Sequence, residues 1–251
     1  MGKILAVVNQ KGGVGKTTTA VNLTAALHDL GLKVLLVDFD PQANATSGHG
    51  VDKRRIKQSV YDVIINGAAA AAAIVKTPYG DVLPSHPDLA GAGVELLSIS
   101  KPNHQLATAL QTVRDQYDLI LIDCPPSLEL LTLNGLCAAD GILVPVQCEY
   151  FALEGLSDLM STLRAVKRRL NPRLEIFGVA LTMFDGRTNF STQVAQEVRR
   201  HFPGKVFATV VPRNIRLAEA PSHGIPITAY DRSSRGAIAY KAMAEEIRSK
   251  L

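Results

Sequence analysis

The residues best suited to chemistry form a glycine-rich run with two lysines at positions 10–18, Gln-Lys-Gly-Gly-Val-Gly-Lys-Thr-Thr. This run closely follows the apolar stretch at residues 4–8 and opens a stretch rich in Ala and Leu. A turn between a strand and a helix presents backbone N–H groups, and the positive end of the helix, to an anion. Lys16 would neutralise β/γ-phosphate charge, and the Thr17 hydroxyl is a ligand for Mg²⁺. The run therefore predicts a loop that holds the phosphates of a nucleotide.

The loop departs from the ordinary pattern G-x-x-x-x-G-K-[ST] at its entrance. Gln10 stands where a glycine is expected, and a second lysine, Lys11, follows it. We expect a lysine at this place to project away from the phosphates bound by its own chain. It would then reach phosphates held by a second, face-to-face subunit. Lys11 is therefore the candidate for the additional cation that phosphoryl transfer requires.

Two apolar stretches end in carboxylates that could serve the same site. Asp38 and Asp40 come after residues 34–37, and Asp123 comes after residues 119–122. In a parallel sheet, ligands bind beyond the carboxyl ends of the strands, where an aspartate can hold Mg²⁺ through water. Asp38 and Asp40 share a face of an extended segment, so one of them could orient the attacking water. Acidic residues also end strands as helix caps or turn formers, and this alternative stays open, most of all for Asp38.

The elements that must position these residues alternate between short apolar runs and helical stretches. Continuous Val/Ile/Leu runs are typical of parallel strands that are buried on both faces. Strands are predicted at residues 3–9, 33–38, 119–123, 141–145, 175–182 and 206–211. Helices are predicted at residues 16–30, 104–116, 151–169, 191–201 and 235–251. The alternation predicts an α/β fold, a mostly parallel twisted β-sheet flanked by helices on both faces.

Length and composition set further limits. The 251 residues are 47% hydrophobic and carry a formal charge of +4, which permits a DNA or lipid partner without requiring one. We expect a single domain over residues 1–251, soluble and without a signal peptide. Residues 76–102 are predicted to form loops with one or two short strands, such as 94–98, and the alanine run at 67–75 a helical turn. Three cysteines without C-x-x-C spacing indicate reduced thiols.

Taken together, the motifs resemble the ParA/MinD class of P-loop ATPases, whose deviant Walker A motif is K-G-G-x-G-K-[ST]. Residues 11–17 match this motif, and within the class the chain is similar to the short chromosomal ParA proteins, often called Soj. Further matching segments run along the chain: V-D-F-D-P-Q at 37–42, D-C-P-P-S at 123–127, P-V-Q-C-E-Y at 145–150, D-G-R-T-N at 185–189 and P-R-N-I-R-L-A-E-A-P-S-H-G at 212–224. The N-terminal helix-turn-helix of larger plasmid ParA proteins is not expected here, because the first strand begins at residue 3.

The resemblance implies a Mg²⁺-dependent ATPase with weak intrinsic activity that forms an ATP-sandwich homodimer. Lys11 would contact the partner's nucleotide, and Lys16 and Asp40 would serve catalysis. Thr17 would bind the metal, with Asp123 and, less directly, Asp40 acting through water. The residues implied for ATP are Lys11, Gly12, Gly13, Val14, Gly15, Lys16, Thr17, Thr18, Pro212 and Asn214.

The resemblance also implies that the ATP-bound dimer binds double-stranded DNA without sequence preference. Arg187 and Arg216 match positions that the family uses for DNA, and a ParB-type centromere-binding protein would stimulate hydrolysis. The expected location is the cytoplasm, on the nucleoid and not on a membrane. The basic residues at 167–169 and 199–200 end predicted helices, where they complement the helix dipole without any partner. For them a DNA contact and a structural role are both open.

Three other functions would each require sequence features that can be compared with this chain. A MinD-like membrane regulator would need a basic amphipathic tail, whereas residues 237–251 show an apolar stripe typical of core packing. A metallo-cluster carrier would need paired ligand spacing, which the cysteines do not provide. A P-loop kinase or amidoligase would need an added substrate domain or a lid segment, and neither is visible in the sequence.

Overall fold

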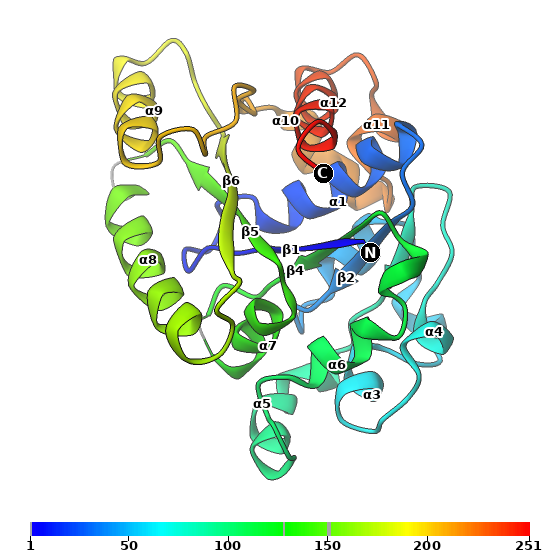
Figure 1. The fold of residues 1–251 in the computed structure, drawn as a ribbon. Helices are drawn as coiled ribbons and strands as arrows, with labels where there is room; N and C mark the ends of the chain where they lie inside the picture. Colours follow the sequence, from blue (N-terminus) through cyan, green and yellow to red (C-terminus); the bar gives the residue numbers. More distant parts are fainter. Residues whose placement is uncertain (1, 128, 150–151) are drawn as a thin grey trace.

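The protein, described here from a computed structural model at residues 2–127, 129–149 and 152–251, is built on one six-stranded sheet (Figure 1). The order of the strands is β3-β2-β4-β1-β5-β6, and every pair of neighbours is parallel. The strands are β1 (Lys3–Val7), β2 (Val34–Asp38), β3 (Asp81–Leu83), β4 (Leu119–Asp123), β5 (Gly141–Gln147) and β6 (Glu175–Thr182). The predicted α/β fold with a parallel sheet is confirmed.

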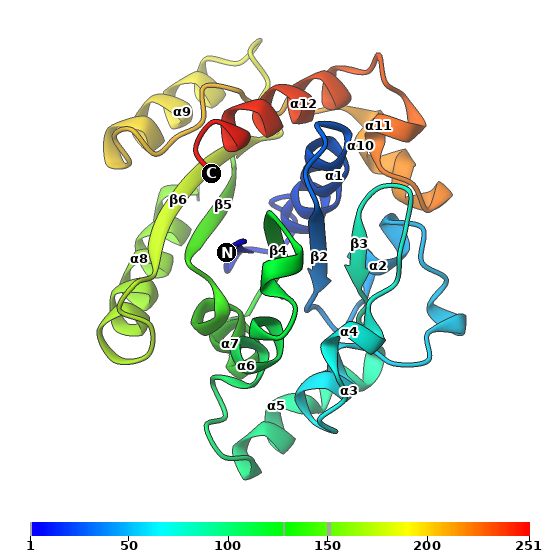
Figure 2. The same ribbon diagram turned by 45° about the vertical axis from the view of Figure 1, so that its right-hand side comes forward.

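Helices cover both faces of the sheet (Figures 1 and 2). One face carries α1 (Lys16–Asp29), α10 (Ile215–Glu219), α11 (Ile227–Tyr230) and α12 (Arg235–Arg248). The lower part of Figure 2 shows α3 (Val60–Ile64), α4 (Ala70–Ala73), α5 (Ala92–Glu95), α6 (Gln105–Gln111) and α7 (Leu130–Ala138). The remaining helices are α2 (Asn44–Gly48), α8 (Ala152–Arg169) and α9 (Asn189–His201). The predicted start of α8 at Phe151 lies outside the described residues.

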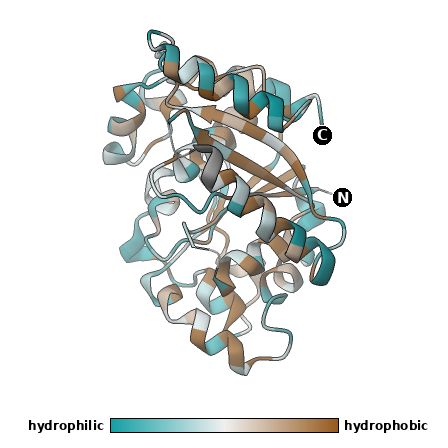
Figure 3. Ribbon diagram, turned by 90° about the vertical axis from the view of Figure 1, so that its left-hand side faces the viewer, coloured by the Kyte–Doolittle hydropathy of each residue, from teal (hydrophilic) through white to brown (hydrophobic). Residues whose placement is uncertain are grey.

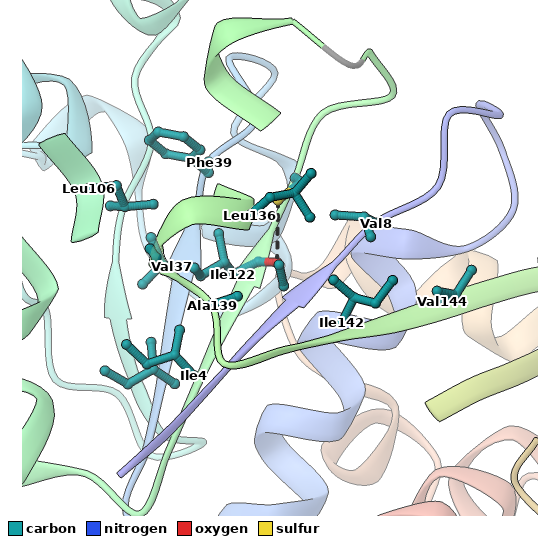
Figure 4. Close-up of a cluster of buried hydrophobic side chains, with 14 of the residues drawn as sticks. Ile4, Val8, Val37, Phe39, Leu106, Ile122, Leu136, Ala139, Ile142 and Val144 are labelled. Carbon is teal, nitrogen blue, oxygen red and sulfur yellow. Dashed lines mark hydrogen bonds between the residues drawn. The ribbon is translucent and has the colours of Figure 1, made fainter. Parts of the chain in front are cut away.

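The strands are buried because alternate side chains enter two separate apolar cores. Ile4 and Ala6 of β1 pack with side chains from α3 to α9, and Leu5 and Val7 pack with α1 and α12. Figure 4 shows part of the first core, in which Ile4, Ile122 and Ile142 of three neighbouring strands belong to the same cluster as Leu136 of α7. Hydrophobic residues accordingly follow the strands while hydrophilic ones gather on outer helix faces (Figure 3). This burial on both faces explains why the sequences of the strands are unbroken apolar runs.

Two predicted strands are wrong. Residues 206–211 lie along β6 but form a single isolated bridge there, Val179 with Val206. The amides of Ala208 and Thr209 instead donate to the carboxylate of Glu246 on α12, at 2.9 and 2.7 Å. These two amides are therefore not available for hydrogen bonds within the sheet. Residues 94–98 are helical, in α5 and the 3₁₀ turn Leu96–Ser98.

The error at residues 94–98 has a physical reason. Leu89, Ala92 and Leu96 are buried at a helical spacing, whereas Val94 and Leu97 face solvent. The true strand of this region, β3, has only three residues and lies at the edge of the sheet, so its apolar signal is short. The alanine run does contain the predicted helical turn, α4.

The last helix, α12, packs its apolar stripe against the core and not against a solvent-facing surface. Tyr240, Met243, Ala244 and Ile247 are all buried, and the Tyr240 hydroxyl lies 3.1 Å from the Thr19 hydroxyl of α1. The stripe is therefore core packing up to Ile247, as predicted, whereas Leu251 at its end is 45% exposed. None of the helices in the described part of the chain is long and apolar enough to cross a membrane.

A buried histidine makes stability sensitive to acid. His49 follows α2, is fully buried, and its Nε2 lies 3.0 Å from the Tyr79 carbonyl, so this nitrogen donates. Burial lowers the pKa of His49 from 6.5 to about 4. The unfolded chain takes up the proton first as pH falls below 6.5, so folding stability is present above that pH and is lost towards pH 4.

We expect wild type to lose about 2–3 kcal/mol more stability than His49→Gln between pH 7.5 and 4.5. Glutamine keeps a donor for the Tyr79 carbonyl and cannot be protonated. Urea unfolding at the two pH values measures the difference, with His201→Gln, at the exposed end of α9, as the control. Equal losses in wild type and His49→Gln would contradict the assignment.

Candidate nucleotide-binding site

The glycine-rich loop joins β1 to α1 and has the shape of a cradle. Gly13 and Gly15 have φ angles of +75° and +91°, which residues with a Cβ rarely adopt. A Cβ placed on Gly12 or Gly13 would meet no atom within 4 Å, so the backbone of this turn is open to an approaching ligand. The loop thus presents amides next to the first turn of α1, an arrangement suited to phosphate groups.

Lys16 lies inside this cradle with only 7% of its surface exposed. Its Nζ donates a hydrogen bond to the backbone carbonyl of Lys11 at 2.9 Å, which closes the loop around the side chain. Burial lowers the pKa of Lys16, and the carboxylates of Asp123 and Asp40 oppose this shift. The ammonium is therefore desolvated, and a desolvated cation in this loop would stabilise anionic oxygens strongly.

Asp123 provides the observation that bears on a metal. The sheet register sets Asp123 beside Asp38, and both carboxylates are completely buried. Neither oxygen of Asp123 has a hydrogen-bond partner among the described residues. Burial and the charge of Asp38 raise the pKa of Asp123 well above its usual range, while the nearby Thr17 hydroxyl and Lys16 oppose the rise. Two buried acceptors without donors, next to a hydroxyl, fit a hydrated Mg²⁺ ion.

Asp38 and Asp40 have different surroundings. One oxygen of Asp38 accepts hydrogen bonds from the amide and hydroxyl of Thr46, at 2.7 and 2.6 Å, so this residue fixes α2 to the end of β2. Burial raises the pKa of Asp38 to about 6. Asp40 is only partly buried, and its carboxylate accepts from the Gln42 amide at 2.9 Å. Asp40 is thus the carboxylate at the site that remains accessible.

A cavity of about 470 Å³ lies beside the phosphate loop and could hold a base. Gly15 and Thr18 line one side of it, and Pro212 and Asn214 line the other, so the structure brings these predicted ATP contacts together. Tyr240 of α12 also lines it. Residues 212–214 are placed by the pairing of Phe184 with Pro212 and by a hydrogen bond from the Arg213 amide to the Phe184 carbonyl at 3.2 Å.

Two supporting residues were missed by the sequence reasoning. Thr182, the last residue of β6, donates its hydroxyl to the Val14 carbonyl at 2.8 Å and so braces the loop. Tyr240 connects α12 to α1 through Thr19. Both contacts join segments far apart in sequence, and no local motif signals them.

Lys11, which we expect to project away from the phosphates bound by its own chain, has a charged partner within this structure. Its ammonium forms an ion pair with Glu149, beyond the end of β5, and both side chains are about one-third exposed. The Lys11 amide also donates to Asn9 at 3.0 Å. The contact across a dimer interface stays a prediction. Glu149 belongs to the matching segment at 145–150, for which the sequence predicted no role, and Tyr150 of the same segment lies outside the described residues.

The two arginines proposed from the sequence for DNA contact are exposed and carry acidic neighbours. Arg187 pairs with Asp185 through two hydrogen bonds at 2.9 and 2.7 Å. Arg216 pairs with Glu219 at 2.8 Å and lies 3.6 Å from Asp231. The two arginines are thus not held in the phosphate site. Because such exposed pairs are weak, phosphates of another molecule could replace these carboxylates.

Comparison with known proteins identifies the family. Residues 2–176 match the protein family AAA_31, described as an AAA domain. The chain is 54% identical over 249 residues to the "Sporulation initiation inhibitor protein Soj" of Bacillus subtilis strain 168, with 98% of each chain covered. It belongs to the Soj/ParA family of P-loop ATPases. The "Chromosome partitioning protein ParA" of Caulobacter vibrioides is 49% identical over 252 residues, covering 99% of this chain and 94% of the relative.

A solved structure adds the same fold with ligands bound. It is that of the Mycobacterium smegmatis protein named cobyrinic acid a,c-diamide synthase, with ADP and magnesium. The TM-score is 0.85 at 39% identity, and the alignment covers 98% of this chain and 93% of the other. The predicted membership in the ParA/Soj group is confirmed, and the fold is one that binds an adenine nucleotide with magnesium in a homologous structure.

Proposed function

We propose that this Soj/ParA chain is an ATP-dependent chromosome-partitioning switch. In the cycle, ATP binding assembles a homodimer, the dimer binds DNA, and hydrolysis releases it. The observation that carries the proposal is that three features lie together at the carboxyl ends of the strands. The buried Lys16 ammonium, the unpartnered Asp123 carboxylate and the 470 Å³ cavity all border the loop at residues 11–17. We also propose that residues 1–251 act as one ATPase domain.

Each part of the nucleotide has a proposed set of contacts. The loop amides and Lys16 take the phosphates, and Thr18, Pro212 and Asn214 border the base. The Thr17 hydroxyl holds Mg²⁺ directly, and Asp123 holds it through water. When bound, Mg²⁺ neutralises charge that develops on the phosphate oxygens. The family relationship and the ligands of the Mycobacterium smegmatis structure support this assignment.

Hydrolysis further requires a positioned water, and we assign that role to Asp40. Asp38 is engaged by Thr46, whereas Asp40 is accessible and close enough to stabilise the charge of Lys16. The Asp40 carboxylate can accept a hydrogen bond from water and orient its lone pair towards the γ-phosphate. Since a second subunit and an activator complete the site, turnover by the chain alone should be slow.

The Asp40→Ala variant tests the switch directly. We expect ATP hydrolysis to fall by on the order of 100-fold, because a positioned proton acceptor typically contributes that much or more. ATP binding and dimer formation should persist, so the protein should stay on immobilised duplex DNA after wild type has dissociated. Phosphate release and DNA dissociation are measured on the same samples.

Asp40→Asn serves as the matched control for that variant, because it keeps an acceptor for the Gln42 amide and removes only the charge. It should hydrolyse ATP as slowly as Asp40→Ala. Hydrolysis by Asp40→Ala at the wild-type rate would remove the proposed role of this residue. Wild type that never binds DNA with ATP would overturn the partitioning function itself.

The proposed partners are duplex DNA and a ParB-type protein that stimulates hydrolysis. Arg187 and Arg216 would contact DNA phosphates and release counterions, which requires no base sequence. The names of the Bacillus subtilis and Caulobacter vibrioides relatives support a role in partitioning. The proposed location is the nucleoid in the cytoplasm.

The alternative functions are less well supported. The apolar stripe of α12 is buried up to Ile247, so it is occupied by core packing and we do not favour a MinD-like anchor. The diamide synthase name belongs to a structure of 39% identity, below the two relatives named for partitioning. Burial raises the pKa of Cys137 and Cys148 to about 11 and that of Cys124 still further. These thiols are therefore poor nucleophiles. The described residues contain no group of three or more His, Cys, Asp or Glu side chains placed to hold a metal ion.

A further inference from the structure

A second, larger cavity lies outside the proposed nucleotide site. It has a volume of about 1050 Å³ and is lined by residues 49–58 after α2 and by residues 72–79. His223, Gly224 and Ile225, which follow α10, close it on a third side. None of these residues has a role in the mechanism proposed above.

The segment at residues 52–58 concentrates positive charge at the rim of this cavity. This segment has four basic residues and one acidic residue, Asp52, in a chain whose formal net charge is only +4. The basic residues are Lys53, Arg54, Arg55 and Lys57. The side chains of Arg54 and Arg55 are 90% and 89% exposed, and both approach Asp52, at 3.2 and 3.6 Å. Exposed pairs of this kind contribute little, so the charge is available to an external anion.

The backbone of the segment is ordered although its side chains are exposed. Residues Lys53–Arg55 form a 3₁₀ turn, in which the Asp52 carboxylate accepts from the Arg54 amide at 3.0 Å. The Asp52 carbonyl accepts from the Arg55 amide at 3.0 Å, and the Lys53 ammonium donates to the Gln42 carbonyl at 2.8 Å. An ordered backbone reduces the conformational entropy that binding must remove.

This basic segment lies on the same side of the molecule as Arg216. The chain runs from Arg216 in α10 through the turn Ala220–His223 to Gly224. A Cβ on Gly50 would lie only 3.2 Å from the Gly224 carbonyl oxygen, so the two segments are in contact. Figure 2 shows α2, α10 and α11 together on this side, with the chain after α2 extending beyond them.

We propose that Lys53, Arg54, Arg55 and Lys57 contact phosphates of duplex DNA and extend the DNA-binding surface from Arg216 across this cavity. The inference rests on the proposed function as a DNA-binding switch. A small anion would be held best by buried cations, whereas these side chains face solvent. An exposed row of cations gains most from a polyanion, because each phosphate contact releases a condensed counterion.

The test uses wild type loaded with Mg²⁺ and AMPPNP, and a triple variant, Arg54→Ala/Arg55→Ala/Lys57→Ala. The matched control is Lys167→Ala/Arg168→Ala/Arg169→Ala, which removes the same charge from the exposed end of α8, on the opposite side in Figures 1 and 2. Because these cations end a helix whose dipole they complement, and lie away from Arg216, we assign them the structural role. Fluorescence anisotropy with a labelled duplex is measured over a series of salt concentrations. Arg216→Ala provides a comparison within the proposed surface.

We expect the triple variant to weaken DNA binding at least about tenfold at low salt and to reduce the slope of log K against log [salt] by about one for each lost contact. The α8 control should keep the wild-type slope, and both triple variants should form the AMPPNP dimer. An unchanged salt slope in the segment variant overturns the inference, as does an equal loss of DNA affinity in the α8 control. In either case DNA binding by wild type leaves the proposed function standing. Failure of wild type to bind DNA overturns both.

Short-chain inorganic polyphosphate tests whether the same cations form a binding site for a small anion and not for duplex DNA. It is titrated into the AMPPNP-loaded proteins, whose phosphate loops are already filled. Competition with DNA on wild type that disappears in the segment variant supports the inference. Polyphosphate binding that depends on the segment while DNA binding does not depend on it overturns the inference.

Discussion

The Lys16→Ala protein should bind Mg²⁺-ATP about 100-fold more weakly than wild type, or worse. Lys16 is the buried cation of the loop, and truncating one member of a desolvated, hydrogen-bonded charge pair typically costs 2–5 kcal/mol. A loss of about 2.7 kcal/mol corresponds to a factor of 100 in affinity. The carboxylates of Asp123 and Asp40 would also lose the cation that offsets them. Isothermal titration calorimetry measures the affinity, and ATP hydrolysis should fall with it.

Two controls separate charge from structure in this experiment. Lys16→Gln keeps a donor for the Lys11 carbonyl but no charge, so it should bind ATP almost as weakly as Lys16→Ala. Lys241→Ala removes an exposed lysine of α12 and should bind like wild type. Circular dichroism verifies that each variant is folded. Tight ATP binding by folded Lys16→Ala would show that the triphosphate does not occupy this loop.

The second large effect concerns Lys11, whose loss should block dimer formation without blocking ATP binding. The proposed role places its ammonium on the triphosphate of a facing subunit, where no other cation of the loop can substitute. Light scattering compares Asp40→Ala with Lys11→Ala/Asp40→Ala. Because both proteins carry Asp40→Ala, ATP hydrolysis does not affect the comparison. With ATP, the first protein should be dimeric and the second monomeric, and both should bind ATP.

Glu149 supplies the control for the Lys11 experiment, because Lys11 pairs with it in this structure. Glu149→Gln removes the carboxylate and keeps the ammonium. In the Asp40→Ala background it should still form the ATP-dependent dimer. If it is monomeric, the ion pair and not the ammonium matters for assembly. An ATP-dependent dimer of the Lys11→Ala protein would rule out the contact across the interface.

The parts of the site that could be predicted from sequence are those encoded locally. The loop at residues 11–17 and the aspartates that end β2 and β4 each lie next to an unbroken apolar run. A parallel sheet brings the ends of such runs to one edge. This reasoning placed Lys16, Asp40 and Asp123 together, and the structure has them close enough for their charges to interact.

The parts that were missed depend on contacts between distant segments. Glu149 is 138 residues from Lys11, and Thr182 is 168 residues from the Val14 carbonyl that it binds. The failure of residues 206–211 as a strand has the same origin, since Glu246 of another element takes the amides of Ala208 and Thr209. Periodicity reports on burial along one segment and carries no information about such partners.

The contacts of α12 have a consequence for ligand selectivity. Through Glu246 this helix fixes the segment that leads to Pro212, and through Tyr240 it holds α1 behind the phosphate loop. One rigid helix thereby sets the separation between the two halves of the ligand site. On the proposed assignment of the 470 Å³ cavity to the base, we expect discrimination between a nucleoside triphosphate and bare triphosphate to depend partly on Tyr240 and Glu246.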